Sequence, residues 1–235
     1  MKGAVTTGKR LLTFFLCLLV GYAAVELLLP PLVSQVVGRG MTSFTGSSQV
    51  TVAVEKRPAF LMLNGEFDKI SVTAVNAQTE KLTFADMKII LRDVRLDLPA
   101  LLAERTVKIK SVGDIDLTAA VARDELANCL NRNVKGIKNA TVAITPEKVQ
   151  VGSSFAVGGL ANVALKIDGR IVSDGSKIKF VTERFLLNNN LVGNLGGALA
   201  TEVTLADLKK LPFAVGIRSI VLETGRVVIY ADNRL

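Results

Sequence analysis

Apolar and polar residues alternate along most of the chain beyond residue 48, which is the pattern of half-buried β-strands. The clearest run covers residues 107–121. Its apolar residues all fall on odd positions: Val107, Ile109, Ile115, Leu117, Ala119 and Val121. Its even positions hold mainly Lys, Asp and Thr. We therefore predict a single central strand over Val107–Val121, with one buried face and one wet face.

A second alternating stretch, residues 82–98, changes its apolar face twice. The apolar positions are Leu82 and Phe84, then Met87, Ile89 and Leu91, and then Val94, Leu96 and Leu98. Since a shift of one residue turns a strand's side chains to the other face, we expect β-bulges or sharp bends near residues 85–86 and 92–93. Bulges increase local twist, so the sheet should be strongly curved.

The second half of the chain repeats this plan with hairpins and short helices. Turn residues between alternating segments predict hairpins at 145–147, 173–175 and 224–225. Short helical pieces are expected at 58–64, 124–130 and 207–211, and a loose glycine-rich helix at Leu191–Leu199. Few connections are long enough for parallel crossovers, so the sheet should be antiparallel. The expected fold class is α+β: a strongly curved antiparallel sheet with a few short helices, in a single domain over residues 30–235.

The N-terminus has the pattern of a membrane-targeting segment. Lys2, Lys9 and Arg10 precede a run from Leu11 to Leu29 in which only Glu26 is charged, and 19 residues are about enough to span a bilayer. One interpretation is an uncleaved signal anchor over residues 1–29, and the other is a signal peptide cleaved after Ala23. In both, the positive flank stays inside and the body is exported, to the periplasm or the outer face of the inner membrane.

Two further features refine this N-terminal interpretation. The apolar pattern continues through residues 25–29 without a clean extended site for a peptidase, which favours the anchor. Pro30 and Pro31 then predict the end of the membrane segment, and a separate short amphipathic helix is expected over residues 32–41.

The amino-acid composition limits the catalytic and metal-binding mechanisms that are possible. Hydrophobic residues make up 49% of the chain but aromatic residues only 5%, with no Trp, so the core should be aliphatic. The chain has no His, which excludes a Ser-His-Asp triad, an imidazole metal ligand and a histidine base. Cys17 lies in the membrane segment, so it cannot form a disulfide with Cys129. We therefore predict no enzymatic activity, no cofactor and no metal.

Other candidate motifs are weak. Asp114 and Asp116 lie two residues apart on the wet face of the predicted strand, but no third acid accompanies them. Gly193, Gly196 and Gly197 do not form a phosphate-binding loop. These residues are better explained as a solvated strand face and as close helix packing.

Net charge points to an anionic partner. The formal charge is +8, of which Lys2, Lys9 and Arg10 contribute three. A mild excess of positive charge favours an anionic surface such as phospholipid headgroups, although a simple solvated basic surface explains it as well. The basic residues are scattered and do not interleave with aromatics, so nucleic acid is not the expected partner. Protein partners stay undetermined.

Several short segments resemble the LmeA-like phospholipid-binding family in their order and spacing. They are Leu63–Val72, Leu91–Asp97, Asp124–Ala127, Leu211–Phe213, Ile217–Ile220 and Glu223–Ile229. The likeness covers most of residues 55–232. It implies a bacterial periplasmic or cell-envelope protein that binds phospholipid. It also implies a curved sheet wrapped about helices, related to the tubular lipid-binding superfamily, and no established catalytic residues.

Pattern and resemblance together predict a protein that binds phospholipid or a related amphiphile in an apolar groove at the cell envelope, for lipid transfer or presentation. The residues expected to line the groove are Val36, Phe60, Phe67, Phe84, Ile89, Leu117, Leu126 and Leu130. Basic residues at the rim would meet the phosphate. The alternative is a structural envelope protein whose groove is filled by its own side chains.

Overall fold

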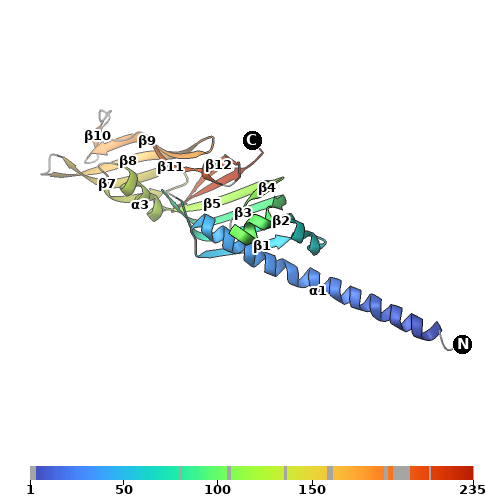
Figure 1. Cartoon of the computed structure of the whole chain (residues 1–235). Coiled ribbons are helices and arrows are strands. Elements are labelled where there is room, and N and C mark those ends of the chain that lie inside the picture. Colours follow the sequence, from blue (N-terminus) through green and yellow to red (C-terminus); the bar gives the residue numbers. More distant parts are fainter. Residues whose placement is uncertain are drawn as a thin grey trace.

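The chain forms one long helix followed by two antiparallel β-sheets and a few short helices (Figure 1). The computed structural model describes residues 4–79, 81–104, 107–134, 137–157, 161–187, 190–192, 202–211 and 213–234. The expected α+β class and antiparallel pairing are confirmed, and one sheet is a strongly curled half-barrel.

The first sheet contains strands from both ends of the chain. Its strands are β1 (Gln49–Glu55), β2 (Glu66–Gln78), β3 (Thr83–Leu96), β4 (Ile109–Ser111), β5 (Ile115–Ala122), β12 (Gly216–Glu223) and β13 (Arg226–Asp232). They are ordered β1-β2-β3-β5-β13-β12, and β4 also pairs with β3. The C-terminal hairpin therefore completes a sheet that the N-terminal half begins.

The second sheet is built from consecutive strands. These are β6 (Lys138–Ile144), β7 (Val149–Val157), β8 (Ala161–Asp174), β9 (Lys177–Leu187), β10 (Asn190–Val192) and β11 (Glu202–Asp207). Their order is β10-β9-β8-β7-β6, with β11 also paired to β9. The three predicted hairpin turns are confirmed as the β6–β7, β8–β9 and β12–β13 connections.

Three of the short helices occur where acidic, proline and glycine signals predicted them: η1 (Ala59–Asn64), α3 (Arg123–Asn133) and η2 (Leu208–Lys210). A fourth, α2 (Leu98–Glu104), was not predicted, and Leu98, expected in a strand, begins it. η1 ends at Gly65, whose φ is +79° and whose Cβ, if present, would lie 2.3 Å from the carbonyl oxygen of Leu96. Of the predicted glycine-rich helix, Leu191 belongs to β10, whereas Leu195 and Leu199 lie outside the described residues.

Helix α1 (Ala4–Thr45) is continuous, so the predicted break at Pro30–Pro31 is wrong. Prolines remove backbone donors from a helix interior, but packing of a helix face can outweigh that cost. Here the C-terminal third of α1 packs on β1 and β2, and Val37 and Met41 are fully buried. The separate amphipathic helix that the sequence predicted is the buried end of the same helix.

The two face changes in β3 are confirmed, but they do not shift the register between β2 and β3. The strands stay in one register, and the buried face changes in both at the same two places. At one place Asn76 lies opposite Ala85, and at the other Asp93 lies opposite Asp68. Asn76 and Asp93 have φ values of +54° and +50°. Paired bends, rather than an extra residue, therefore reverse the faces of both strands.

The predicted single strand over residues 107–121 is wrong, because Val112–Asp114 interrupt it. Gly113 lies against the bend in β3, and its amide donates to the carbonyl of Arg92. The approach is close, because an added Cβ would lie 3.1 Å from the Cβ of Asp93. The remaining part, β5, is central as expected, between β3 and β13. Its odd-numbered residues, Ile115 to Val121, are buried.

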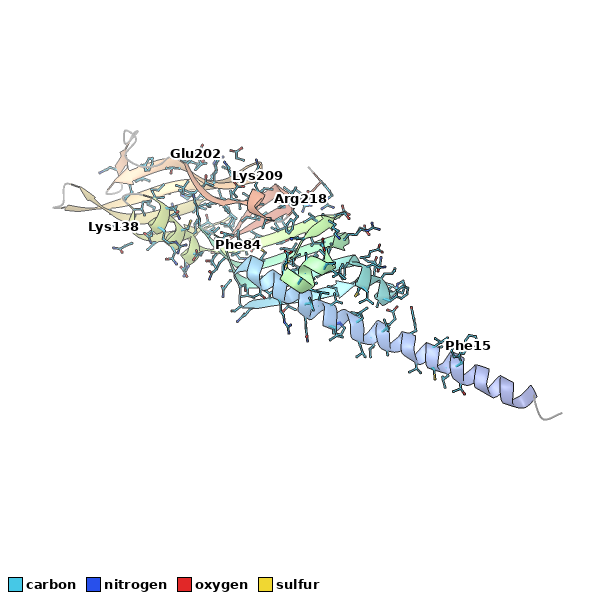
Figure 2. The ribbon with its side chains drawn as sticks, viewed as in Figure 1. Phe15, Phe84, Lys138, Glu202, Lys209 and Arg218 are labelled. Atoms are coloured by element: carbon cyan, nitrogen blue, oxygen red, sulfur yellow. The ribbon has the colours of Figure 1, made fainter. Side chains whose placement is uncertain are left out.

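One continuous hydrophobic cluster contains residues from both sheets, the end of α1 and α3. Cys129 and Leu126 of α3 are completely buried in it. The unpacked part of α1 projects from this body, with Phe15 far from the sheets and Phe84 inside the body (Figure 2).

Candidate functional site

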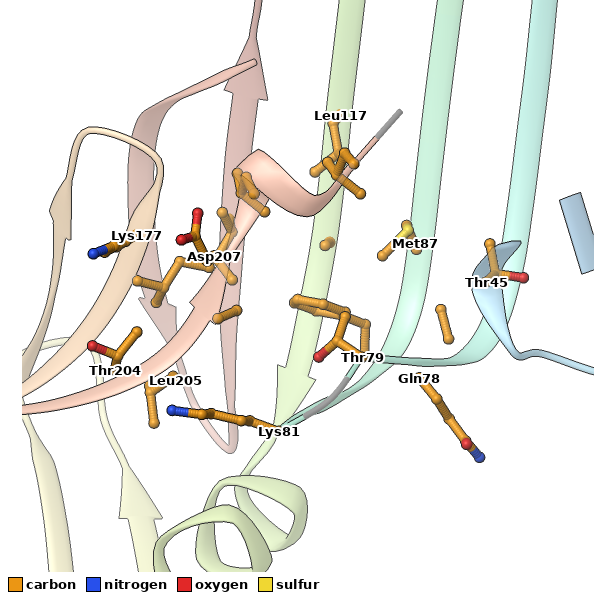
Figure 3. A pocket seen from close by; sticks show the side chains of 18 residues that line it. Thr45, Gln78, Thr79, Lys81, Met87, Leu117, Lys177, Thr204, Leu205 and Asp207 are labelled. Carbon is orange, nitrogen blue, oxygen red and sulfur yellow. The ribbon is translucent and has the colours of Figure 1, made fainter. Parts of the chain in front are cut away.

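A cavity of about 610 Å³ lies where the two sheets meet (Figure 3). The first sheet supplies Ala77, Gln78, Phe84, Met87, Leu117, Ala119 and Ile229. The second sheet and η2 supply Lys177, Ile178, Thr204, Leu205, Ala206, Asp207, Leu208 and the following Leu211. Thr45 at the end of α1, with Thr79 and Lys81 of the β2–β3 loop, completes the lining. Residues far apart in the sequence therefore build the site together.

The floor of the cavity is a row across three neighbouring strands. Met87 of β3 pairs with Ala119 of β5, which pairs with Ile229 of β13. The small Ala119 side chain lies between two larger ones, so the row is lowest at its centre. The bend at Asn76 and Ala85 brings Phe84 onto the same side of the sheet as this row. Local backbone geometry thus makes an apolar hollow in an otherwise filled face.

The opposite wall depends on an irregularity in β11. The register between β11 and β9 shifts between Thr204 and Ala206. Leu205 and Ala206 are consequently both buried, at 2% and 7% exposure, whereas a regular strand would turn one of them outward. Two successive apolar side chains therefore cover the hollow of the first sheet.

Charged groups gather around this apolar lining. Lys81 and Lys177 are exposed, and neither ammonium has a carboxylate within 4 Å among the residues that the structure describes. Lys81 reaches toward Thr204 and Leu205 (Figure 3). The amide of Lys209 donates to Asp207 and, together with Ser176 and nearby lysines, holds the pKa of Asp207 below its usual range. The cavity thus offers two free cations beside one ionised carboxylate.

Helix α3 holds the loop that carries Lys81. The guanidinium of Arg132 donates to the Lys81 carbonyl at 3.2 Å and to Glu125 Oε1 at 2.9 Å. The same oxygen of Glu125 accepts the amide of Thr83 at 3.1 Å. Both ends of the short segment containing Lys81 and Thr83 are therefore fixed to one helix.

The structure brings two of the eight predicted lining residues, Phe84 and Leu117, to this cavity. Four others are buried in the core without lining it: Phe67, Ile89, Leu126 and Leu130. Val36 is half-buried on α1, and Phe60 is 48% exposed on η1. The wall from β11 and η2 and the two lysines were missed. Their only sequence signal was an apolar stretch at 203–211 with basic residues near it.

Other reactive groups are engaged elsewhere. Asp116, half of the acidic pair noted in the sequence, bonds Arg92 at 2.6 Å and also Arg234, and the Arg92 hydrogen bond lowers its pKa. Burial raises the pKa of the Cys129 thiol, which disfavours the reactive thiolate. Within the described ranges, no group of three His, Cys, Asp or Glu residues is placed to hold a metal ion. The cavity is thus the feature with the clearest ligand-binding geometry.

Comparison with known proteins agrees with this geometry. The profile of the LmeA-like phospholipid-binding family matches residues 24–232, nearly the whole chain. Searches of curated proteins and of solved structures found no match. The family is a lipid-binding family and not a known enzyme family. In addition, residues 12–42 of α1 form a helix long and apolar enough to cross a membrane, with a mean hydropathy of 2.3. The chain belongs to the LmeA-like phospholipid-binding family.

Proposed function

We propose that this protein binds a phospholipid or a related amphiphile in the cavity between its two sheets. The observation that carries the proposal is an apolar hollow with two lysines at its edge that form no ion pair with any described residue, in a chain of this family. A volume of about 610 Å³ lies within the usual range of small-molecule sites. It suits part of an amphiphile, with acyl carbons inside and the polar head outside.

Two kinds of energy would hold such a ligand. Acyl carbons against Met87, Leu117 and Leu205 would gain about 25 cal/mol for each Å² of apolar surface removed from water. An anionic phosphate near Lys81 and Lys177 would gain a Coulomb term that salt screens within about 10 Å. The apolar term gives affinity for the chain, and the charged term gives preference for an anionic head.

We further propose that α1 anchors the protein in the inner membrane of a bacterium, with the sheets on the outer side. Most of the apolar side chains from Leu12 to Leu28 are exposed, and Phe15 is 64% exposed. Lys9 and Arg10 precede them, and a positive flank stays in the cytoplasm. A carrier or a presenting protein would fit this placement.

A structural role without ligand is the second candidate, because most of the apolar interior is filled. Phe67, Ile70 and Ile89, each at most 2% exposed, belong to the part of the core that the protein's own side chains fill. Along α1, Glu26 and Thr45 are about 28 Å apart at 1.5 Å per residue. If α1 spans the bilayer, the cavity therefore stands well above the membrane and is not immersed in it.

Native mass spectrometry of the full chain, extracted in mild detergent, separates the two candidates. Lipid binding predicts a bound phospholipid mass that survives removal of detergent. It also predicts that the double variant Lys81→Ala/Lys177→Ala loses anionic lipid in preference to zwitterionic lipid. Lys88→Ala is the matched control, since Lys88 lies exposed on the outer side of β3. A wild-type protein that carries no lipid, and takes none up from mixed vesicles, would favour the structural role.

A further inference from the structure

Exposed apolar side chains outside α1 gather at one end of the body. Among the described residues, the large hydrophobic side chains exposed outside α1 are Phe60, Leu63, Leu102 and Val221. Three of them belong to η1 and α2, and both of these elements pack against α1. Phe60, Leu63 and Leu102 are 48%, 64% and 67% exposed. Exposed apolar groups that cluster in this way mark an interaction surface.

η1 and α2 are neighbours held in fixed positions. The amide of Leu96, just before α2, donates to the carbonyl of Gly65, just after η1, at 2.8 Å. In Figure 1 the teal turn lies at the end of the body from which α1 projects, and the green helix lies alongside α1. The two elements therefore present their apolar residues together, around the point where α1 leaves the body.

A carboxylate on α1, that of Glu26, fixes the position of η1 along the helix. Glu26 Oε1 accepts the amide of Ala59, the first residue of η1, at 3.0 Å and the hydroxyl of Tyr22 at 2.8 Å. Glu26 is the one charged residue between Leu11 and Leu29. Its contact with the body thus explains a carboxylate in an otherwise apolar run and fixes η1 beside the last turns of that run.

The length of the apolar run places this position at a membrane surface. Residues 11–29 extend roughly 28 Å at 1.5 Å per residue, close to the roughly 30 Å of hydrocarbon in a bilayer. If Arg10 lies at the inner headgroups, Glu26 and Leu29 lie at the outer boundary. Phe60 and Leu63 then stand at the depth where amphipathic and aromatic side chains enter the interface.

Charge at the same place suits lipid headgroups. Arg57 precedes η1 and is exposed; its backbone amide donates to Asp68 Oδ2 at 3.1 Å, whereas its guanidinium has no carboxylate within 4 Å in the part of the chain that the structure describes. The neighbouring Lys56 is instead paired with Asp68 at 2.8 Å. A guanidinium without an ion-pair partner, three residues before exposed Phe60, offers the two contacts that an interfacial segment makes, one with phosphate and one with acyl carbon.

We propose that Phe60, Leu63 and Leu102 form a collar that inserts into the outer leaflet around α1, with Arg57 on the lipid phosphates. This rests on the membrane anchoring proposed above and extends it: the body is seated on the bilayer rather than tethered above it. The collar fixes the tilt of the body, and it keeps the cavity at a constant height for whatever delivers or receives the lipid.

The absence of Trp gives a clean test. Single variants Phe60→Trp, Phe15→Trp and Val221→Trp of the full chain are each reconstituted into phosphatidylcholine vesicles whose lipids carry bromine either near the headgroup or at mid-chain. Bromine quenches tryptophan at contact. Phe15→Trp reports on the membrane span, Phe60→Trp on the collar, and Val221→Trp on an exposed apolar site of β12 away from α1.

The collar predicts that Phe60→Trp loses most of its emission with bromine near the headgroup and much less with bromine at mid-chain. Val221→Trp keeps its emission with both lipids. Quenching of Phe15→Trp at mid-chain without any quenching of Phe60→Trp would overturn the collar while leaving the anchor intact, and would favour a protein partner on this surface. No quenching of Phe15→Trp would overturn the anchor and the collar together.

Discussion

The guanidinium of Arg132 on α3 donates a hydrogen bond to the backbone carbonyl of Lys81 at 3.2 Å. Arg132 is remote in sequence from Lys81 and does not line the cavity. It nevertheless holds the segment that carries one of the two free cations at the cavity edge. A residue outside the site therefore positions a charge within it.

Arg132→Ala should weaken retention of anionic phospholipid without changing retention of zwitterionic phospholipid. An exposed pair contributes up to about 1 kcal/mol, which corresponds to a loss of up to about fivefold. Native mass spectrometry with mixed lipids measures the ratio. Arg123→Ala on the same helix is the control, because among the described residues the Arg123 guanidinium pairs with Asp124 alone, at its own end of α3. If both variants lost anionic phospholipid equally, the loss would come from removing any positive charge on α3, and the positioning of Lys81 by Arg132 would be contradicted.

Filling the cavity should separate ligand binding from stability. Ala119→Leu adds apolar carbon at the centre of the Met87–Ala119–Ile229 row, where the space is. Each newly buried methylene stabilises the fold by about 0.8 kcal/mol if it fits without strain. We expect unchanged or higher resistance to urea and a clear loss of co-purified lipid. Thr118→Leu, on the other face of β5, should leave lipid retention as it is. Full retention in Ala119→Leu would mean that the ligand lies elsewhere.

Much of the fold could be predicted from the sequence because its strands are amphipathic. Alternation located β5 and the hairpins, and the two face changes in β3 located the bends at Asp93 and opposite Asn76. It could not distinguish an extra residue in one strand from paired bends in two, since both reverse the buried face. It also joined β4 to β5, because Gly113 interrupts the strand without breaking the odd-position pattern.

The site was less predictable, because it depends on contacts between the two sheets. Phe84 and Leu117 were named because they are apolar and inward-facing, but Phe67 and Leu126 share that pattern and lie in the filled core. The cavity-lining residues differ from the core residues in having space beside them, which a small side chain such as Ala119 leaves open. The cavity wall formed by β11 arises from a register shift between Thr204 and Ala206, which no local sequence pattern predicted.

Ile89 and Ile90 should differ sharply in their effect on stability. Ile89 is fully buried on β3, opposite Val72 and Leu117, whereas Ile90 is half-buried on the other face. Ile89→Ala should cost 2–5 kcal/mol, roughly, because it leaves a cavity in a filled core, and Ile90→Ala should cost much less. Urea unfolding of the full chain in mild detergent, followed by circular dichroism, measures both. Similar costs would contradict the assignment of the inner face.

Acid sensitivity should depend on Asp116. Its carboxylate accepts hydrogen bonds from Arg92 and Arg234, which joins β5 to β3 and to the C-terminal residues. The Arg92 contact lowers its pKa from the ordinary 3.8. Because the folded pKa lies below the unfolded one, the stabilisation is complete above the unfolded value. It is lost as pH falls from about that value through the lowered one.

Asp116→Asn should therefore be less stable than the wild type at neutral pH and should lose less stability between pH 4 and pH 2, roughly the range of this titration. The difference at neutral pH should stay near or below about 1 kcal/mol, because both arginines are substantially exposed to solvent. Urea midpoints measured at several pH values test this. Asp86→Asn is the control, since Asp86 is exposed and forms no ion pair within the described chain. An acid response in Asp116→Asn as steep as that of the wild type would assign the titration to other carboxylates.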